Sequence, residues 1–532
     1  MCFLSRDRTM EDVSAGSEVA AFYEGQTVLV TGGSGFMGKV LVEKLLYACP
    51  GLARLYLLMR PKRGKSAEQR LQDMWKLPMF HRVLAQRREA LAKVRLVEGD
   101  VLSEDLGLEP AAADQLRAEV SVVFHGAATL RLEARLEDAV RMNVEGTQRV
   151  LRLCRGMKNL KAFVHSSTAF CHCDQEELEE RLYPCPVDPE DIVRLVKWLD
   201  PDTLHAITPR IISPHPNTYT FTKRLAEELV RREFPAMPVS IARPSIVTPA
   251  WREPLPGWVD NLNGPIGLLV AAGKGVLRSL HCMHHYHAEV IPVDFAINGL
   301  AIIAAKVGRN ADKLSEVPVY NLTASSVKRY TWVEVLNMGR HLIYEYPFEM
   351  TVWYPNGNIH NSKLVHTFNV FFFQWIPAYL IDFLMIIFMQ KTFMVRIQRR
   401  IADGLAVLQY FTTRKWVFNS RNYVSLHAEQ NPVDRKLFSI DLSQVDVPDY
   451  LKDGLLGSRQ YCMKEDLSSL PRCRRNLKIL YVVDKLWTLV LLLLLLYLAC
   501  CFSEPARHAA LGAAGYVRSA PLVGTLARRV TG

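Results

Sequence analysis

The chain has 532 residues, of which 49% are hydrophobic and 22% are charged, and its formal net charge is +11. A chain of this length is too long to fold around a single hydrophobic core, so we expect at least two folded domains. The cations lie in scattered clusters without interleaved aromatic residues, which argues against a nucleic-acid-binding module and favours anionic ligands or anionic lipid. The eleven cysteines lack the spacing of a disulfide framework, so we expect reduced thiols in the cytosol.

The first apolar stretch of the chain predicts a dinucleotide-binding turn. Residues 27–30 read as a short buried strand, and Gly32-x-x-Gly35-x-x-Gly38 reads as the turn into a helix that continues to Leu46. One glycine permits the tight turn, one lets the backbone approach a pyrophosphate, and one lets the helix pack closely on the strand. Free N–H groups at the helix N-terminus can bind that anion. The predicted cofactor-binding residues here are Thr31, Gly32, Ser34, Gly35, Phe36, Met37 and Gly38.

A basic loop after the second predicted strand indicates which dinucleotide is bound. The strand covers residues 55–59, and Arg60-Pro61-Lys62-Arg63-Gly64-Lys65 follows it. Proteins of this kind that choose NAD place a carboxylate here for the ribose 2′-hydroxyl, whereas those that choose NADP place a cation. Four cations and no acid therefore favour NADPH, with Arg60 as the best candidate for the 2′-phosphate and Lys62 and Arg63 as further contacts. The alternative is an ordinary solvated basic loop.

The next two predicted strands, residues 94–101 and 120–124, carry further candidates for the cofactor site. The first ends in Gly-Asp-Val, where Asp100 can accept a hydrogen bond from the adenine amino group and Val101 adjoins it. The second is followed by small residues, including Ala127, that leave room for the cofactor. Asn143 stands inside a predicted helix, where an asparagine is unfavourable unless its amide bonds something specific.

A fifth predicted strand and a later helix carry the candidate catalytic groups. The strand, residues 161–170, has a cluster of hydroxyls at its carboxyl end, the edge at which open α/β sheets bind ligands. Tyr219 and Lys223 are four residues apart on the helix that Asn217 opens, so they share one helical face. The lysine ammonium is expected to lower the phenol pKa, so that Tyr219 exchanges a proton with a substrate oxygen that Thr168 holds.

These residues resemble the extended short-chain dehydrogenase/reductase superfamily, and the longer phrases are more similar to alcohol-forming fatty acyl-CoA reductases. The phrases that carry the closer resemblance are residues 35–46, 60–64, 183–189, 216–223 and 241–247, and the match runs from about Tyr23 to about Asp466. The resemblance implies Thr168 as the hydroxyl partner, Tyr219 as proton donor and Lys223 as its activator and a contact of the nicotinamide ribose. It also places Arg243, Pro244, Ser245 and Ile246 at the nicotinamide pocket. The family usually has Val-Ser-Thr-Ala-Tyr where this chain has residues 165–170, so Ser167 rivals Thr168.

The resemblance implies an α/β fold: a Rossmann-type doubly wound parallel sheet with a mostly helical C-terminal domain and a C-terminal transmembrane helix. The expected division is a disordered tail without a secretory signal over residues 1–22, an NADP-binding reductase domain over 23–310, and a substrate-side segment and linker over 311–365. The fatty acyl-CoA reductase C-terminal domain then covers 366–480, a transmembrane anchor 481–503 and a tail 504–532. The proline-rich residues 248–265 are expected to form a loop over the active site.

The histidine-rich run from His281 to His287 invites a metal interpretation. Zinc sites need ligands fixed in tetrahedral geometry, and this run has no second cluster at suitable spacing. We therefore expect a loop of the family here and no metal.

Two apolar stretches bear on membrane attachment. Residues 368–389 hold Gln374, Pro377 and Asp382, and a carboxylate in mid-span costs about 2.5 kcal/mol or more, so an interfacial helical segment is preferred to a span. Residues 486–502 carry no charge and predict a single-pass anchor, and the basic residues that precede them place the catalytic domain in the cytosol. The membrane of the endoplasmic reticulum and that of the peroxisome both remain open.

The leading hypothesis is the NADPH-dependent, four-electron reduction of a long-chain fatty acyl-CoA to a primary alcohol and CoA, through an aldehyde. Membrane attachment suits it because both the acyl chain and the alcohol partition into lipid. One rival is another membrane-anchored enzyme of the superfamily, acting on a steroid or a sugar nucleotide or releasing the aldehyde. The other rival is a catalytically silent scaffold that binds NADP without turnover.

Overall fold

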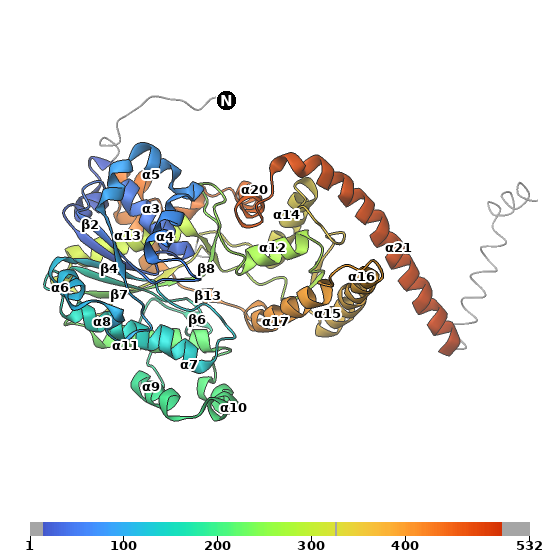
Figure 1. Cartoon of the computed structure of the whole chain (residues 1–532), viewed down its shortest axis with the longest axis horizontal. Coiled ribbons are helices and arrows are strands. Elements are labelled where there is room, and N and C mark those ends of the chain that lie inside the picture. The colour runs from blue at the N-terminus through green and yellow to red at the C-terminus, as the bar shows by residue number, and fades with distance from the viewer. Residues whose placement is uncertain (1–13, 325–326, 503–532) are drawn as a thin grey trace, which may run out of the picture.

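A seven-stranded parallel sheet forms the centre of the computed structural model, which describes residues 14–324 and 327–502 (Figure 1). The strands follow the order β11-β7-β5-β4-β1-β2-β3. Their bounds are β1 Thr27–Thr31, β2 Arg54–Met59, β3 Val94–Glu98, β4 Val122–His125, β5 Ala162–Ser166, β7 Val239–Pro244 and β11 Val319–Leu322. The direction of strand addition reverses between β1 and β4, and such a switch point is where sheets of this type bind ligands. The predicted doubly wound parallel sheet is confirmed.

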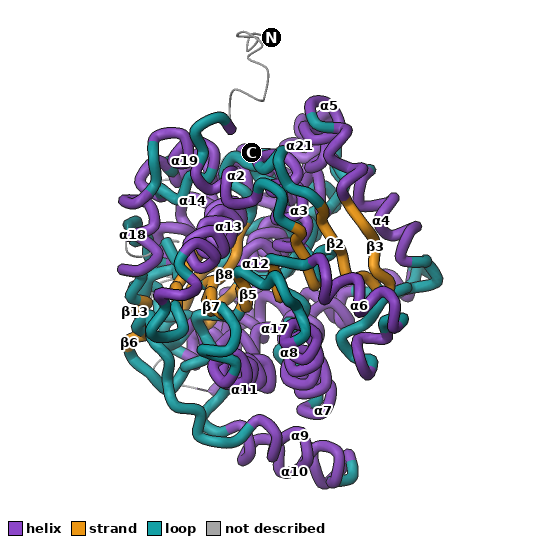
Figure 2. The backbone as a smooth tube through the Cα atoms, turned by 90° about the vertical axis from the view of Figure 1, so that its left-hand side faces the viewer, coloured by secondary structure: helices purple, strands orange, loops and turns teal. Residues whose placement is uncertain are grey.

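Helices cover both faces of the sheet, as the apolar strands require (Figure 2). Helices α3 (Phe36–Ala48) and α13 (Val293–Arg309) pack on one face, and α8 (Gly146–Arg155) and α11 (Thr218–Arg232) pack on the other. Alternate residues of β1 are buried in the two hydrophobic cores. Val28 and Val30 pack in the core between the sheet and helices α3 and α13, and Leu29 packs in the core between the sheet and helices α8 and α11. The fold is a three-layer sandwich whose ligand-binding edge lies at the carboxyl ends of the strands.

The other elements complete these layers or build the C-terminal part. The remaining helices are α2 Glu18–Tyr23, α4 Ala67–Trp75, α5 His81–Gln86, α6 Pro110–Glu119, α7 Leu136–Ala139, α9 Pro189–Trp198, α10 Pro201–Ile212, α12 Pro265–Gly273, α14 Trp332–Glu345, α15 Lys363–Val370, α16 Ile376–Ile387, α17 Met394–Thr412, α18 Arg421–Glu429, α19 Pro432–Leu437, α20 Val447–Gly457 and α21 Leu470–Phe502. The short strands form the parallel pairs β8 (Ile246–Thr248) with β10 (Val290–Pro292), β9 (Ser279–His281) with β12 (Asn358–His360), and β6 (Glu177–Leu178) with β13 (Val417–Phe418).

The boundaries expected from the sequence differ from the structure in two places. Strand β11 was expected in the linker 311–365, but it pairs with β7 and forms the edge of the central sheet. Helix α18 was expected in a separate C-terminal domain, but its Tyr423 is buried against α13 and donates a hydrogen bond of 3.1 Å to the carbonyl oxygen of Phe295. The chain therefore returns to the reductase core after residue 420 because α13 offers an apolar face there.

The expectation of a disordered tail over residues 1–22 is wrong for its last part. Residues 18–22 belong to helix α2, capped by Ser17, whose side chain accepts a hydrogen bond from Ala20 N. The hydroxyl of Ser17 donates to Asp434 of α19 at 2.5 Å, and Tyr23 is fully buried. This packing against the C-terminal segment orders the helix. Residues 1–13 lie outside the described residues, as does the tail 504–532.

Two described helices are long and apolar enough to cross a membrane, judged by length and composition. One is the C-terminal helix α21, which contains the predicted anchor and projects away from the sheet in Figure 1. The other runs over Lys363–Ile387, where α15 and α16 are joined through a short π-helical turn. Most of the apolar side chains of both helices are exposed.

Candidate active site

Residues predicted for the site follow six of the seven strands of the sheet at their carboxyl ends. They are Gly32 after β1, Arg60 after β2, Asp100 after β3, Ala127 after β4, Thr168 after β5 and Ser245 after β7. Because all strands are parallel, these residues meet at one edge. The sequence-based placement of a single site at this edge agrees with the geometry of the sheet.

The glycine-rich turn after β1 fits a pyrophosphate. Gly32 has a φ of +76°, and a Cβ there would lie 2.7 Å from the backbone carbon of Gly126. A Cβ on Gly38 would collide with the carbonyl oxygen of Gly32, so α3 can approach the turn only with glycine at this position. Gly35 is the N-cap of α3 and supplies no side-chain cap, which leaves the first N–H groups of the helix, at Phe36 and Met37, open to an anion.

The hydroxyl of Thr31 is bonded to other residues of the protein. Its Oγ1 lies 2.7 Å from Nδ1 of His125 and accepts a hydrogen bond from Ala127 N at 3.3 Å. Nε2 of the same histidine lies 3.0 Å from Oγ1 of Thr147. Burial lowers the pKa of His125 to about 3, so the ring is neutral. Thr31 therefore ties β1 to β4 and shapes the loop around Ala127 from behind.

The basic loop gathers more cations than its own sequence contains. Arg70, on α4, donates from Nη2 to Ser34 Oγ at 2.8 Å and from Nη1 to the carbonyl oxygen of Arg60 at 2.5 Å. Arg60 itself forms an ion pair of 2.7 Å with Asp100. Burial, followed by Arg60, Arg70 and the nearby cations, lowers the pKa of Lys62. This concentration of positive charge next to the glycine turn fits a phosphate group.

Sequence reasoning missed Arg70, although a signal was present. Ser66 and Gln69 form a capping box that starts α4 directly after the basic loop. A residue in the first turn of such a helix points back toward the loop that precedes it. The side chain of Val101 is buried in the hydrophobic core that α8 and α11 cover, and its contact with a cofactor stays a prediction.

Asn143 connects two walls of the site. It lies in a π-helical turn, Val140–Glu145, a distortion that often marks functional positions. Its Oδ1 accepts from Thr129 N at 2.8 Å, and its Nδ2 donates to Thr222 Oγ1 at 3.0 Å. The amide therefore joins the loop after β4 to helix α11, which is the specific bonding that the sequence required of it.

The predicted catalytic residues come together where α11 passes the end of β5. The side chain of Asn217 accepts a hydrogen bond from Thr220 N at 2.9 Å and so starts the helix one residue before Thr218. The half-buried Tyr219 is hydrogen-bonded through its phenol to the hydroxyl of Thr168. Nζ of Lys223 donates to the carbonyl oxygen of Ser166 at 2.6 Å.

The two candidate hydroxyls that follow β5, those of Ser167 and Thr168, have different hydrogen-bond partners. Ser167 Oγ points to Cys171 and makes a hydrogen bond of 3.7 Å with its sulfur, whereas Thr168 faces Tyr219. Both residues are buried. Thr168 is therefore the hydroxyl beside the phenol, whereas Ser167 bonds Cys171.

The pKa of Tyr219 moves opposite to the expectation. Burial raises it well above its ordinary value, and the hydrogen bond from Thr168 opposes that rise only in part. Burial also lowers the pKa of Lys223 to about 8. Tyr219 is therefore a neutral phenol that holds its proton until negative charge develops beside it, which suits a proton donor.

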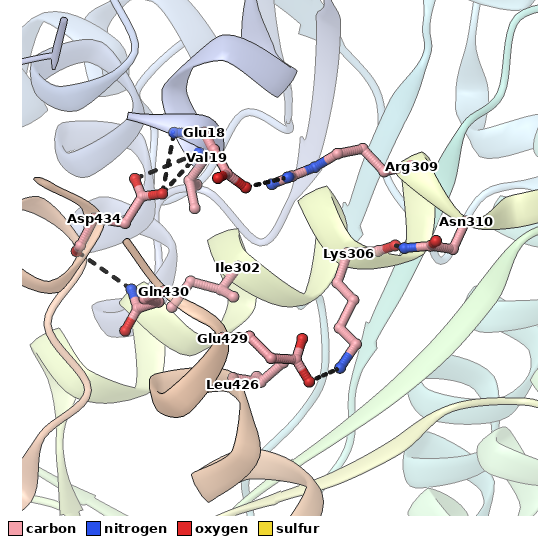
Figure 3. Close-up of a pocket in the computed structure, with 10 residues that line it drawn as sticks. All are labelled: Glu18, Val19, Ile302, Lys306, Arg309, Asn310, Leu426, Glu429, Gln430 and Asp434. Carbon is pink, nitrogen blue, oxygen red and sulfur yellow. Dashed lines mark hydrogen bonds and ion pairs between the residues drawn. The ribbon is translucent and has the colours of Figure 1, made fainter. Parts of the chain in front are cut away.

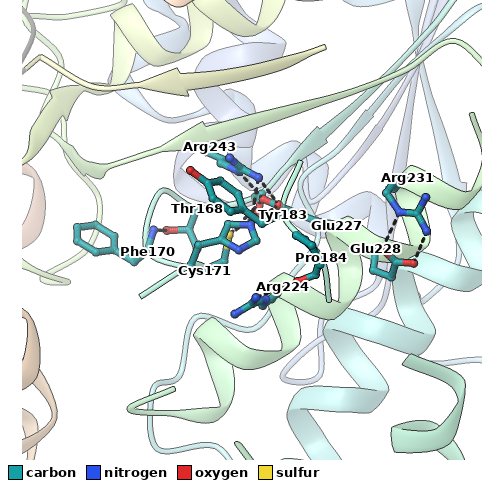
Figure 4. A network of polar contacts seen from close by, with 12 residues as sticks. Thr168, Phe170, Cys171, Tyr183, Pro184, Arg224, Glu227, Glu228, Arg231 and Arg243 are labelled. Carbon is teal, nitrogen blue, oxygen red and sulfur yellow. Dashed lines mark hydrogen bonds and ion pairs between the residues drawn. The ribbon is translucent and has the colours of Figure 1, made fainter. Parts of the chain in front are cut away.

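Arg243 does not line an open pocket, contrary to the expectation. It is fully buried, and its guanidinium binds both carboxylate oxygens of Glu227 at 2.7 and 2.9 Å (Figure 4). Nε2 of His172 lies 2.9 Å from the same carboxylate, and the thiol of Cys171 donates to it at 3.2 Å. Glu227 follows Lys223 by one turn of α11, so this network fixes the catalytic helix against β7.

Cys171, His172 and Glu227 also bring three potential metal ligands within 4.8 Å of one another. Arg243 already occupies both carboxylate oxygens, and burial raises the pKa of the Cys171 thiol far above its ordinary value. A positively charged guanidinium and a protonated thiol both disfavour a cation at this place. An internal ion-pair network accounts for the cluster.

Ser245 supplies an observation in favour of a nicotinamide ring. Its Oγ is buried, and within the described residues it has no hydrogen-bond partner. Its neighbour Pro244 accepts a hydrogen bond of 3.0 Å from Ala169 N, directly after Thr168, and Ile246 begins β8. An unsatisfied hydroxyl beside the catalytic strand fits a ligand with a polar group such as a carboxamide.

The pocket of Figure 3 lies elsewhere. It has a volume of about 130 Å³ and is lined by α2, the C-terminal end of α13, the end of α18 and the residues that follow it. Four of its charged groups form pairs, Glu18 with Arg309 at 3.0 Å and Lys306 with Glu429 at 2.7 Å, and Asp434 accepts a hydrogen bond from Glu18 N at 3.0 Å. Because α13 runs antiparallel to the strands, this pocket is at the amino edge of the sheet, away from the site.

Comparison with known proteins decides the family. Two family models described as "Male sterility protein" match the chain, an NAD-binding one over residues 30–300 and a second one over residues 373–465. Fatty acyl-CoA reductase 1 of Gallus gallus is 34% identical over 493 residues, which cover 92% of this chain and 95% of that protein. Fatty acyl-CoA reductase 2 of Mus musculus is 35% identical with the same coverage.

The chain belongs to the fatty acyl-CoA reductase family. It is accordingly an NAD(P)-dependent oxidoreductase, and the resemblance noted from its motifs is confirmed. Solved structures support the fold of this reductase. The terminal R domain of the myxalamid PKS-NRPS pathway aligns with a TM-score of 0.53 at 18% identity, covering 85% of this chain and 97% of that one. A reductase domain of a nonribosomal peptide synthetase from Mycobacterium tuberculosis aligns with the same score at 17% identity, covering 85% and 98%.

Proposed function

We propose that this reductase uses NADPH to convert a long-chain fatty acyl-CoA to a primary alcohol and CoA, through an aldehyde, at one site. The observation that carries the proposal is the half-buried phenol of Tyr219, hydrogen-bonded to Thr168 at the carboxyl edge of the sheet. Lys223 lies one turn further along the same helix. A hydroxyl, a phenol and an ammonium in this arrangement can polarise a carbonyl oxygen and return a proton to it.

The same side chains serve both reductions. When bound, NADPH supplies the hydride that adds to the carbonyl carbon. In the first reduction, Thr168 and Tyr219 donate hydrogen bonds to the thioester oxygen, where negative charge develops. The carbon–sulfur bond then breaks, CoA leaves as a thiolate that takes up a proton, and an aldehyde remains. In the second reduction, Tyr219 transfers its proton to the aldehyde oxygen, which becomes the hydroxyl of the alcohol.

The positive charge around the glycine turn supports the choice of NADPH. Arg70 bridges Ser34 Oγ and the main-chain carbonyl oxygen of Arg60, at the end of β2 where the adenosine ribose lies in folds of this type. Asp100 does not offer a free carboxylate to a ribose hydroxyl, because Arg60 binds it at 2.7 Å. A 2′-phosphate at this place would therefore bind the guanidinium of Arg70, while Arg60 neutralises the one nearby carboxylate, Asp100.

The C-terminal helix supports a membrane location. The end of α21 is apolar and exposed. Five basic residues precede its charge-free part: Arg472, Arg474, Arg475, Lys478 and Lys485. Such a distribution holds the preceding domain on the cytosolic side of a single-pass anchor. An enzyme attached in this way reaches acyl-CoA, which the names of its relatives identify as their substrate, at the surface where the acyl chain partitions.

The test is the isotopic content of the product. The purified full-length protein in detergent is given palmitoyl-CoA and NADPH that carries deuterium at both C4 positions, and the lipids are analysed by mass spectrometry. The proposal predicts hexadecanol with two deuterium atoms on C1. Hexadecanal with one deuterium as the final product would make the protein a two-electron reductase. Binding of NADPH without reduction of any acyl-CoA would overturn the enzymatic proposal and leave a scaffold.

A further inference from the structure

The helix over Lys363–Ile387 exposes an apolar surface that the reductase core does not cover. The exposed apolar side chains of this helix and of the turn after it are Leu364, Val365, Phe368, Phe371, Tyr379, Leu380, Phe383, Leu384, Ile386, Ile387, Phe388 and Met389. We refer to them as the apolar rim. A contiguous apolar surface of this kind on a soluble domain marks an interaction site. We propose that the apolar rim lies in the interfacial region of the bilayer that holds α21, as a second membrane contact that does not cross the membrane.

The polar residues that argue against lipid contact face the protein. Gln374 is buried, and its Oε1 accepts hydrogen bonds from Arg278 N and Ser279 N at 2.8 and 3.0 Å. Asp382 is also buried, and it accepts backbone hydrogen bonds of 2.9 to 3.0 Å from Met394 and its two neighbours. Asp382 therefore caps the start of α17. The polar side chains on one face of the helix have hydrogen-bond partners in the protein, and the apolar side chains on the other face are exposed and can contact lipid.

A buried ion pair fixes this helix relative to the anchor. Arg278 binds Asp484 of α21 at 2.8 Å, and both side chains are almost fully buried. The guanidinium of Arg278 also lies 5.4 Å from the ring centre of Phe373, next to Gln374. Asp484 is in addition bonded to Trp353 Nε1 at 2.7 Å. Because Asp484 lies just before the charge-free part of α21, the apolar rim is held close to the place where the anchor enters the membrane.

The neighbouring helix explains why the segment does not span. Helix α17 packs along α16 and returns toward the core, and it carries the exposed cations Arg396, Arg399 and Arg400. If Lys363–Ile387 crossed the bilayer, lipid would surround it, and the bonds of Gln374 and Asp382 to the protein would be lost or drawn into the hydrocarbon. An orientation in the plane of the membrane keeps these bonds and leaves the cations at headgroup level.

The charge next to the apolar rim complements an anionic lipid surface. Lys391 follows the rim directly and is exposed, as are the three arginines of α17. Apolar side chains beside cations are the pattern of helices that lie in the interface, where the first enter the acyl boundary and the second attract anionic headgroups. Figure 1 shows α15 and α16 on the same side of the molecule as α21, away from the sheet.

Depth-dependent fluorescence quenching in vesicles tests the proposal. The full-length protein, with Cys2 and the incompletely buried cysteines Cys185, Cys462, Cys500 and Cys501 changed to serine, is labelled with bimane at one introduced cysteine. This is Tyr379→Cys near the middle of the helix or Phe388→Cys directly after its end. Each variant is accepted only if its thermal unfolding in detergent matches that of the unlabelled protein. Vesicles contain phosphatidylcholine and phosphatidylserine, with bromine placed either near the headgroup or near the chain end. Trp198→Cys on α9 is the water-exposed control, and Leu494→Cys on α21 is the deep control.

The proposal predicts that the labels at both 379 and 388 are quenched more by shallow than by deep bromine, while the label at 494 shows the reverse. A label at 379 quenched mainly by deep bromine would mean that the helix crosses the membrane, and would overturn the proposal. Labels at 379 and 388 that escape quenching, like the one at 198, would also overturn it, because the apolar rim would then face water or protein. The readout does not depend on turnover, so it is independent of the proposed reaction.

Discussion

The ammonium of Lys223 donates a hydrogen bond of 2.6 Å to the carbonyl oxygen of Ser166, at the last residue of β5. This bond joins α11 to the centre of the sheet, and Tyr219 stands one turn before it on the helix. Burial lowers the pKa of Lys223 to about 8. The charge that is proposed to hold the nicotinamide ribose is therefore lost at moderately alkaline pH.

We predict that the affinity for NADPH falls as the pH rises through about 8. Above that value Lys223 is a neutral amine, and a hydrogen bond from a charged donor is worth roughly 1 kcal/mol more than one from a neutral donor, which corresponds to a five- to tenfold weaker Kd. Titration of nucleotide fluorescence between pH 7 and pH 9 measures this. Lys223→Met should bind weakly at every pH in that range. A variant that kept the full pH dependence would show that another group titrates.

Replacing the two rival hydroxyls should separate their roles. Thr168→Val removes the hydroxyl beside Tyr219, and the loss of one donor to a developing oxyanion lowers kcat about 100- to 1000-fold. Ser167→Ala removes only the contact with Cys171 and should leave kcat within about fivefold of wild type, since a single neutral hydrogen bond is worth about 1 kcal/mol. Steady-state rates of NADPH oxidation with palmitoyl-CoA measure both. A larger loss of kcat in Ser167→Ala than in Thr168→Val would show that Ser167, and not Thr168, donates to the developing oxyanion.

Arg70 should determine the choice between NADPH and NADH. Arg70→Gln is expected to raise the Kd for NADPH by roughly 10- to 100-fold, the loss of a hydrogen bond to a charged group, and to leave the Kd for NADH unchanged. Lys76→Gln is the matched control, because it removes an equal charge from the other end of α4. Equal weakening of both nucleotides by Arg70→Gln would place Arg70 at the pyrophosphate or in the fold instead of at the 2′-phosphate.

Breaking the buried ion pair behind α11 should destabilise the protein. Burial raises the pKa of Glu227, but Arg243 and His172 outweigh it and hold the pKa well below its ordinary value. Arg243→Met leaves a buried carboxylate unpaired and should lower the free energy of unfolding by about 3–5 kcal/mol. Arg231→Met, which breaks an exposed pair with Glu228, should change it by less than about 1 kcal/mol. Urea unfolding in detergent at pH 7 measures both.

The pH dependence of that ion pair gives a second check. The depressed pKa of Glu227 contributes stability that is present above about pH 4.3, the value in the unfolded chain, and is lost only as the pH falls further. The stability that Glu227 contributes to the wild type should therefore persist from pH 7 to pH 5. In Arg243→Met, burial without the guanidinium raises the pKa of the Glu227 carboxyl, so the difference in unfolding free energy between the two proteins should shrink as the pH falls from 7 to 5. A difference that stayed constant over this range would mean that the carboxyl is not destabilised in the variant.

The parts of the site that were predicted from sequence depend on local patterns. The strand–turn–helix at Gly32 and the face shared by Tyr219 and Lys223 arise from residues close together in the chain, and the structure contains both. The period of a helix or strand and the conformational needs of glycine are enough to find them. The apolar C-terminal helix was visible for the same reason.

The parts that were missed depend on contacts between distant residues. Arg70 reaches Ser34, and Arg278 reaches Asp484, only after the sheet and its helices have formed. Strand β11 joins the sheet edge although its sequence adjoins the expected linker. The pKa of Tyr219 was also misjudged, since Lys223 was visible in the sequence but the degree of burial was not.

The most direct test of the central claim compares wild type with Tyr219→Phe for NADPH oxidation on palmitoyl-CoA, with the lipid products identified by mass spectrometry. The phenylalanine keeps the ring and removes the proton donor, so NADPH should still bind while the rate of alcohol formation falls about 100- to 10,000-fold. Thermal unfolding of the two proteins should agree within a few degrees. Alcohol formed by Tyr219→Phe at the wild-type rate would contradict the account, because the proton would then come from another group.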